Sequence, residues 1–178
     1  MIIAVFGGSA PAPGEQDYED GVLAGKLLAE AGFGVVTGGY GGLMEAVSSG
    51  ARTAGGRVVG VTAPTLFPDR SSPNQHLTEE RTAGGLLERI GELTELSAAS
   101  ITLPGSIGTL TELTAAWNLA FVSRYSGTVP KPIVTVGERW RRVVRDLTEI
   151  LDTDGSLVTC TETVPAAVAT VSDLLSSG

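Results

Sequence analysis

The sequence predicts an α/β fold: a single Rossmann-like, doubly wound parallel sheet with helices on both faces. Short apolar segments alternate along the chain with longer segments whose apolar residues recur at helical spacing. The short segments are continuously apolar instead of alternating apolar and polar, which is typical of parallel strands covered on both faces. No linker divides the chain, so we expect residues 1–178 to form one domain.

The first half of the chain supplies three strands and two helices. The runs "IIAVFGGS" (2–9), "FGVVTGG" (33–39) and "RVVGVTAP" (57–64) are apolar and end in loop residues, which predicts buried strands. Residues 16–32 and 42–55 carry apolar side chains at helical spacing, which predicts a helix after each of the first two strands.

The second half begins with residues 65–85, which are rich in Pro, Ser and charge and predict a long loop of functional importance. Beyond this loop the alternation resumes. The predicted helices are 86–97, 109–123, 139–155 and 165–177, and the predicted strands are 100–105, 131–137 and 156–164.

Composition and charge exclude several classes of function. The net charge of −8 argues against non-specific binding to nucleic acid or to anionic membranes. One cysteine, Cys160, and one histidine, His76, leave no internal disulfide and no expected metal site. No apolar run reaches the roughly 18 residues of a membrane span, and "MIIAVFGGS" lacks the basic start of a signal peptide. We therefore expect a cytoplasmic protein.

Ligands of doubly wound sheets bind beyond the carboxyl ends of the strands, which directs attention to "LPGSIGT" (103–109). Glycines allow a tight turn there, and the N–H groups of residues 107–110 would point outward from a helix N-terminus, an arrangement suited to phosphate. The alternative is an ordinary strand–helix turn with Thr109 as N-cap. The candidate substrate-binding residues of this loop are Gly105, Ser106, Ile107, Gly108 and Thr109.

A second glycine-rich strand end, "TGGYGGLMEA" (37–46), also precedes a helix. It is neither the dinucleotide pattern Gly-x-Gly-x-x-Gly nor a Walker loop. Two such strand ends in one small sheet favour a shared pocket for a mononucleotide, although close packing of helix on strand is the alternative. The candidate substrate-binding residues here are Gly38, Gly39, Gly41 and Gly42, together with Ser9 at the end of the first strand.

Glu112 follows Gly108 by four residues, one turn into a predicted helix. The helix dipole alone would stabilise a carboxylate there. Beside a phosphate, however, a carboxylate is useful when positive charge develops between the two groups. Cleavage of an N-glycosidic bond has this property, because its transition state resembles an oxocarbenium ion.

These motifs resemble those of the LONELY GUY (LOG) family, proteins often mistaken for lysine decarboxylases. "TGGYGGLMEAVSSGA" is similar to the family's Gly-Gly-x-x-Gly-Leu-Met segment, and "LPGSIGTLTE" is similar to its Pro-Gly-Gly-x-Gly-Thr-x-x-Glu signature. The opening of the chain also matches the family's layout. The resemblance covers roughly residues 2–140.

The resemblance implies a phosphoribohydrolase. Such an enzyme splits a nucleoside 5′-monophosphate, either a cytokinin riboside monophosphate or AMP, into the free base and ribose 5-phosphate. It implies no cofactor, no metal and a homodimer with the active site near the interface. The family's catalytic Glu corresponds to Glu112, and its catalytic Arg, fifteen residues before the signature Pro, corresponds to Arg89.

The chain departs from the family pattern with Ser106 for a glycine, Ile107 for an aromatic residue and Ile90 for a lysine, and the Met-His that usually precedes the Arg is missing. These departures leave the cytokinin substrate open. A second hypothesis is therefore a non-catalytic carrier of a nucleotide or a molybdenum cofactor. A third, a decarboxylase with a lysine Schiff base, is disfavoured because neither Lys26 nor Lys131 stands at the carboxyl end of a predicted strand, where a ligand would bind.

Two further segments bear on partners. The predicted helix 109–123 is apolar on more than one face, which favours a contact between two subunits. "RWRRVVRD" (139–146) places four arginines in a short stretch, which we interpret as a solvated face or as interface salt bridges and not as a nucleic-acid site.

Overall fold

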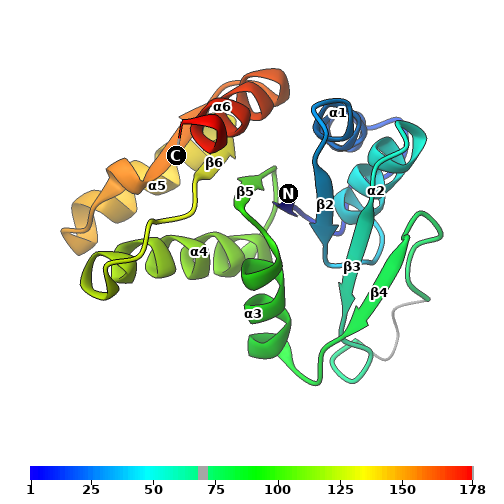
Figure 1. Ribbon diagram of the computed structural model, residues 1–178, viewed down its shortest axis with the longest axis horizontal. Helices are drawn as coiled ribbons and strands as arrows, with labels where there is room; N and C mark the ends of the chain where they lie inside the picture. The colour runs from blue at the N-terminus through cyan, green and yellow to red at the C-terminus, as the bar shows by residue number, and fades with distance from the viewer. Residues whose placement is uncertain (68–71, 178) are drawn as a thin grey trace.

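The computed structural model describes residues 1–67 and 72–177, and its centre is one parallel sheet. The sheet has seven strands in the order β4-β3-β2-β1-β5-β6-β7 (Figure 1), which confirms the predicted doubly wound α/β fold. The strands are β1 (Ile2–Phe6), β2 (Gly34–Thr37), β3 (Val58–Thr62), β4 (Glu79–Thr82), β5 (Ala99–Thr102), β6 (Ile133–Val136) and β7 (Val158–Thr161).

Helices cover both faces of this sheet. Helices α1, α2 and α6 pack on one face and α3, α4 and α5 on the other (Figure 1). The helices are α1 (Gln16–Glu30), α2 (Leu43–Thr53), α3 (Leu86–Leu96), α4 (Ile107–Ser126), α5 (Glu138–Leu151) and α6 (Val164–Ser176), with a short 3-10 turn η1 (Gly155–Leu157) before β7.

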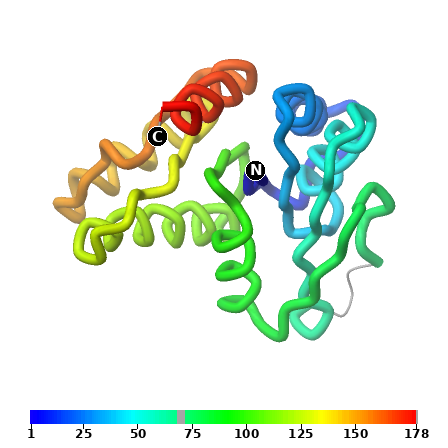
Figure 2. Tube along the Cα trace, in the orientation of Figure 1, coloured from blue at the N-terminus to red at the C-terminus, as the bar shows by residue number. Residues whose placement is uncertain are grey.

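Strand β1 explains why the strands read as continuously apolar. Its side chains alternate between the two faces: Ile3 and Val5 pack with the α1, α2 and α6 residues, whereas Ala4 and Phe6 pack with residues of β2, β3 and α3. Both sets are buried, so period-two alternation leaves no polar face. Because β1 is the central strand of the sheet and pairs with β5, the N-terminus lies in the middle of the chain trace (Figure 2).

The winding of the sheet reverses at β1. Ala4 is paired with Val36 of β2 on one side and with Ser100 of β5 on the other. Strands β2 to β4 extend the sheet in one direction and β5 to β7 in the other. Ligand sites of such sheets lie at the carboxyl ends of the strands beside this reversal.

The prediction of an uninterrupted loop over residues 65–85 is wrong, because β4 lies within it. Glu79–Thr82 pairs with β3 at the edge of the sheet, Glu79 opposite Val59 and Arg81 opposite Val61. An edge strand is covered less than a central one, so it can carry charged residues and shows no apolar run. Residues 68–71 of the predicted loop lie outside the described residues.

Candidate functional site

Three glycine-bearing loops meet at the carboxyl ends of β1, β2 and β5. Gly8 donates its N–H to the Pro104 carbonyl at 3.0 Å, and Leu43 donates its N–H to the Gly8 carbonyl at 2.9 Å. Gly42 has a φ of +70°, and a Cβ there would lie 2.6 Å from the Cα of Ser9. Glycine is therefore required at 42, and the structure brings the predicted residues Ser9, Gly42 and Gly105 into one region.

The loop before α4 presents unbonded N–H groups, but with a register that differs from the prediction. The helix begins at Ile107, and Ser106 occupies the N-cap in place of Thr109. The Leu110 N–H donates to the Ser106 carbonyl at 3.0 Å and is not available to a ligand, contrary to our expectation. The N–H groups of residues 107–109 precede this first helical bond and have no acceptor within the helix.

The side chains of this loop divide between solvent and core. Ile107 is 75% exposed, and a Cβ at Gly108 would meet nothing within 4 Å, so this end of α4 is open. Thr109 is only 3% exposed, and it packs so closely on Gly105 that a side chain at 105 would clash with its Oγ1. Gly105 thus serves the packing of Thr109, and the open surface comes from residues 107 and 108.

Arg89 is buried against the second glycine-rich loop. Its Nε donates to the Val61 carbonyl at 2.7 Å and its Nη2 to the Gly38 carbonyl at 2.9 Å. The guanidinium carbon lies 5.8 Å from the centroid of the Tyr40 ring and 5.7 Å from that of Phe67, within the range of cation–π attraction. A Cβ at Gly38 would clash with Arg89 Nη2, so this glycine makes room for the guanidinium.

Glu112 lies in the second turn of α4, one turn beyond Thr109. Burial raises the pKa of its carboxyl group from 4.5 to about 7, and the positive charge of Arg89 opposes this rise. Arg89 is therefore within electrostatic range of Glu112, although the two residues come from different helices. The structure brings together the two residues that the family resemblance paired, and it gives the acid a pKa near neutrality.

The remaining glycines of the second loop differ in exposure. Gly38 and Gly39 are buried, and a Cβ at Gly39 would lie 2.9 Å from the Thr62 side chain. These two therefore fit the alternative of close packing, whereas Gly41 is exposed at the tip of the loop. Tyr40, between them, is 5% exposed and its hydroxyl accepts from the Ala63 N–H at 2.9 Å, which fixes the ring beside Arg89.

Arg139 is exposed, in keeping with the interpretation of residues 139–146 as a solvated face, but the sequence did not indicate that it contacts the first glycine-rich loop. Arg139 Nη1 donates to the Gly105 carbonyl at 3.3 Å. The next residue, Trp140, is buried and donates its Nε1 to the Leu103 carbonyl at 2.9 Å. The available signal was position: Arg139 follows β6 closely, at the same edge of the sheet as the glycine loops.

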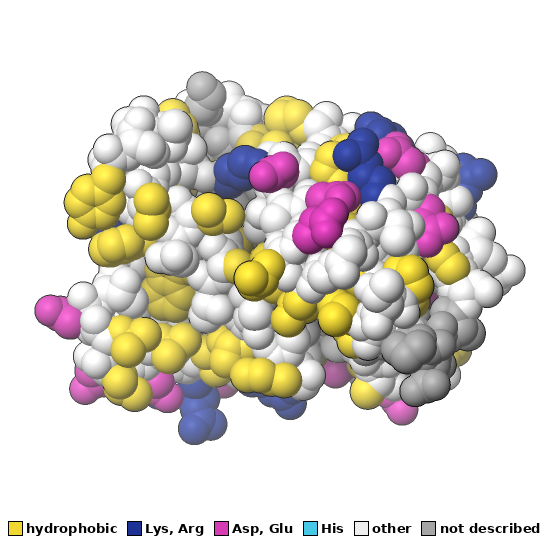
Figure 3. Space-filling view, turned by 90° about the horizontal axis from the view of Figure 1, so that it is seen from below, with side chains coloured by type: hydrophobic (Ala, Val, Ile, Leu, Met, Phe, Trp, Pro, Cys, Tyr) yellow, Lys and Arg dark blue, Asp and Glu magenta, His cyan; other side chains and the backbone are white. Residues whose placement is uncertain are grey.

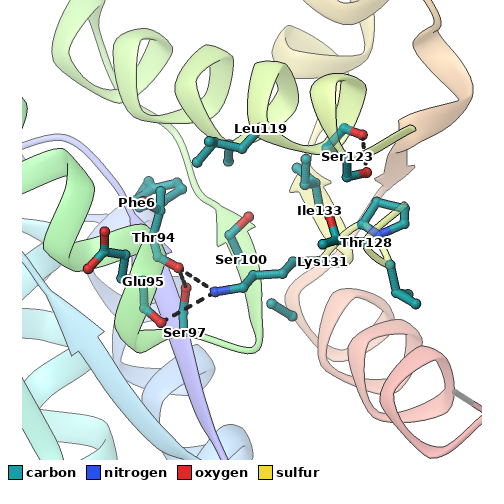
Figure 4. Close-up of a pocket in the computed structure, with 15 residues that line it drawn as sticks. Phe6, Thr94, Glu95, Ser97, Ser100, Leu119, Ser123, Thr128, Lys131 and Ile133 are labelled. Atoms are coloured by element: carbon teal, nitrogen blue, oxygen red, sulfur yellow. Dashed lines mark hydrogen bonds between the residues drawn. The ribbon is translucent and has the colours of Figure 1, made fainter. Parts of the chain in front are cut away.

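A separate cavity of about 320 Å³ lies between α3 and α4, beside the first residues of β5 and β6. Ser100 and Lys131 lie between Phe6 and Ile133 there (Figure 4). Lys131 Nζ donates to the carbonyls of Thr94 and Glu95 near the end of α3. None of the residues that line this cavity belongs to the glycine-rich loops, so it is not the nucleotide site that the sequence predicted.

The surface of α3 and α4 carries several exposed apolar side chains. Figure 3 shows apolar side chains spread over this side of the molecule. The exposed large apolar residues of these helices and of the segment that follows α4 are Leu86, Leu87, Ile107, Leu119, Val122, Tyr125 and Val129. Apolar patches of this kind mark interaction surfaces in soluble proteins.

Residues 1–67 and 72–177 contain no group of three His, Cys, Asp or Glu side chains placed to hold a metal ion. No helix within these ranges has the length and apolar character needed to cross a membrane.

Comparison with known proteins identifies relatives of this chain. A model of the SLOG cluster4 family matches residues 1–122. The chain is 36% identical over 135 residues to the cytokinin riboside 5′-monophosphate phosphoribohydrolase of Mycobacterium tuberculosis, a match that covers 75% of this chain and 69% of that protein. It is 38% identical over 112 residues to the probable enzyme of this name, LOGL5, from Oryza sativa subsp. japonica, covering 62% of this chain but only 45% of the rice protein.

Solved structures resemble the whole chain. The molybdenum cofactor carrier protein of Chlamydomonas reinhardtii matches with a TM-score of 0.77 and 26% identity over 98% of each chain. The molybdenum cofactor binding protein of Rippkaea orientalis matches with a TM-score of 0.76 over 98% of this chain and 96% of that one. At 21% identity, this second likeness concerns the fold alone.

Proposed function

The chain belongs to the SLOG cluster4 family and is a relative of the LOG proteins, and on this premise we propose that it is a phosphoribohydrolase with a single nucleotide-binding domain over residues 1–178. Its substrate is a purine nucleoside 5′-monophosphate, either a cytokinin riboside monophosphate or AMP. The observation that carries the proposal is Glu112, a partly buried acid of near-neutral pKa that lies within electrostatic range of Arg89 and in the second turn of a helix whose N-terminus is open.

In this proposal the phosphate binds at the start of α4. The N–H groups of residues 107–109 have no acceptor within the helix, and the helix dipole favours an anion there. Ser9 follows Gly8, which packs against Gly105 of the same loop. We expect the exposed Gly41 of the second glycine-rich loop to contact the ligand as well. A phosphate held there would orient the ribose toward Glu112, so that binding places the scissile bond close to the catalytic carboxylate.

Glu112 and Arg89 then act on the two sides of the scissile bond. The C1′–N bond breaks and its electron pair leaves with the base, while the hydroxyl of water bonds to C1′ and its proton is transferred to the base. The Glu112 carboxylate holds the ribose hydroxyls, stabilises the oxocarbenium-like transition state and orients the water. Arg89 binds the substrate and favours the departure of electron density into the base.

The apolar face of α3 and α4 supports a homodimer as the working form. This face carries exposed Leu119, Val122 and Tyr125 on the helix that begins at the phosphate loop. A second copy that covers α4 would bury them. That this contact extends toward the site is what the family resemblance implies.

The second candidate is a non-catalytic carrier of a nucleotide or molybdenum cofactor. What favours it is the extent of the likeness to the Chlamydomonas carrier, which spans 98% of the chain, whereas the family model stops at residue 122. Ser106 and Ile107 in the altered signature also point this way. A ligand retained through purification, with no base released from any substrate, would favour the carrier.

The test is to incubate the protein with AMP and with isopentenyladenosine monophosphate and to measure free base by chromatography. We expect base release that falls at least about 100-fold in Glu112→Gln while nucleotide binding persists, because the amide cannot supply the charge. Arg89→Ala and Arg89→Lys should also lose activity. Glu149→Gln, which changes an exposed carboxylate of α5, is the control. Wild-type rates in both Glu112→Gln and Arg89→Ala would refute the mechanism.

A further inference from the structure

Arg139 is fixed beside the proposed phosphate loop by its own neighbour. Trp140 is 3% exposed, and its indole N–H binds the Leu103 carbonyl at 2.9 Å. This bond ties the first turn of α5 to the residue before Pro104. Arg139, one position earlier, reaches the Gly105 carbonyl on the other side of that proline with a distance of 3.3 Å. The start of α5 therefore contacts both ends of the turn that leads into α4.

The guanidinium of Arg139 retains most of its binding capacity. An arginine side chain has five N–H donors, and one donor of Arg139 binds Gly105. The side chain is exposed, so the remaining donors are accessible to a ligand. The neighbouring acid, Glu138, is hydrogen-bonded to Arg141 at 3.1 Å, which draws its charge away from Arg139.

Among the described residues, two arginines bind carbonyls of the glycine-rich loops, and one is buried while the other is exposed. Arg89 binds Gly38 from inside the protein, and Arg139 binds Gly105 from the surface. The N–H groups at the start of α4 offer only the partial charge of the helix dipole. A planar guanidinium adds a full positive charge in the fork geometry that suits phosphate oxygens.

We propose that Arg139 binds the 5′-phosphate of the nucleotide and makes the site selective for nucleoside monophosphates over compounds without a phosphate. This inference rests on the proposed function for the position of the phosphate, and it adds a residue to that site. A competing explanation is that Arg139 only braces the loop through Gly105. The two explanations differ in which ligands they affect, because a brace would disturb every ligand of the loop.

The experiment compares Arg139→Gln with Arg142→Gln. Arg142 is exposed and lies one turn further along α5. Its substitution by Gln removes the same charge and therefore serves as the control. For Arg139→Gln we expect the KM for AMP and the Kd of ribose 5-phosphate to rise roughly 10-fold, as loss of one hydrogen bond to a charged group predicts. The kcat and the Kd of adenine should stay within about twofold of wild type, because neither adenine nor the chemical step involves the lost contact. Arg139→Lys keeps the charge, so its KM for AMP and its Kd for ribose 5-phosphate should lie between those of wild type and Arg139→Gln.

Three results would overturn the inference. The first is an effect of Arg139→Gln on AMP no larger than that of Arg142→Gln. The second is an equal loss of affinity for adenine and ribose 5-phosphate, and the third is a lower kcat with an unchanged KM. Binding of AMP and ribose 5-phosphate by calorimetry needs no turnover. If the wild-type protein releases no base but Arg139→Gln weakens AMP binding, the hydrolase proposal fails and this inference stands.

Discussion

At the scale of single residues, Arg89 and Gly38 depend on each other. A buried guanidinium is costly unless its donors are satisfied, and two of those of Arg89 bind carbonyls that end β2 and β3. One of these carbonyls belongs to Gly38, where any larger side chain would occupy the position of the guanidinium. The glycine of the second motif is thus explained by the arginine that it accommodates.

Glu112 leads to a prediction about stability and pH. Its pKa is about 7 in the folded protein and near 4.5 when exposed, so the folded state binds more protons between these values. Stability from this group is complete below about pH 4.5 and is lost as the pH rises through 7. Relative to wild type, Glu112→Gln should therefore gain about 2 kcal/mol in unfolding free energy between pH 5 and pH 8.

Urea unfolding at several pH values would measure this difference. The wild-type protein and Glu112→Gln share every other titrating group, so their difference isolates this carboxyl. Glu149→Gln provides the exposed comparison and should follow wild type at each pH. A Glu112→Gln difference that stays constant from pH 5 to pH 8 would show that the folded protein does not raise this pKa.

At the scale of elements, two glycines inside helices differ in whether the packing of the helix requires them, and the sequence does not distinguish the two cases. Gly50 lies within α2, and a Cβ there would clash with the Val22 carbonyl of α1. Gly91 lies within α3, and a Cβ there would meet nothing within 4 Å. Close contact between α1 and α2 explains the first glycine, whereas nothing in the structure explains the second.

These two positions give a matched pair of alanine variants. Gly91→Ala should raise the unfolding free energy by about 1 kcal/mol, because alanine is the better helix former. Gly50→Ala gains the same propensity but must separate α1 from α2, and should lose about 2 kcal/mol or more overall. Denaturant unfolding of both variants would measure the difference. Stabilisation of the protein by Gly50→Ala would contradict the close packing of α1 and α2.

Helix α4 shows how a local boundary alters the site. The prediction began it at Thr109, and the alternative of an ordinary strand–helix turn made that residue the N-cap, whereas the helix begins at Ile107. The two additional residues remove the Leu110 N–H from the site and bury Thr109 against Gly105. Ser106 and Gly108 do not identify the start of a helix by themselves, because serine and glycine are both common at N-caps.

At the scale of the whole molecule, the exposure of apolar side chains on the outer surface of the helices leads to a prediction about assembly. Leu119 on α4 is 57% exposed among other apolar residues, and Leu174 on α6 is 44% exposed on the opposite face. If a second copy covers α4, Leu119→Glu should produce a monomer, because a buried unpaired charge is costly. Leu174→Glu should leave the dimer intact. Light scattering after size-exclusion chromatography would measure the mass of each.

Two outcomes would contradict this assignment of the interface. One is a wild-type protein that is monomeric at micromolar concentration. The other is a dimer that survives Leu119→Glu but dissociates in Leu174→Glu, which would place the contact on the α6 face. Base release measured on the same samples would show whether the site requires the second copy.

The sequence by itself determined the alternation of strands and helices, the two glycine-rich strand ends and the residues paired by family resemblance. These features are local, because burial of a strand or of one helix face is recorded in neighbouring residues. The edge strand β4 was not recorded in this way, since its four residues are held by pairing with β3 and carry no apolar pattern.

Only the tertiary structure decided how the site is assembled. The contact of Arg89 with Gly38 joins residues 51 positions apart, and that of Arg139 with Gly105 joins residues 34 apart. The near-neutral pKa of Glu112 results from burial, which depends on how helices and loops from distant segments pack together. Such contacts follow from the arrangement of strands in the sheet, and no periodicity within a single segment encodes that arrangement.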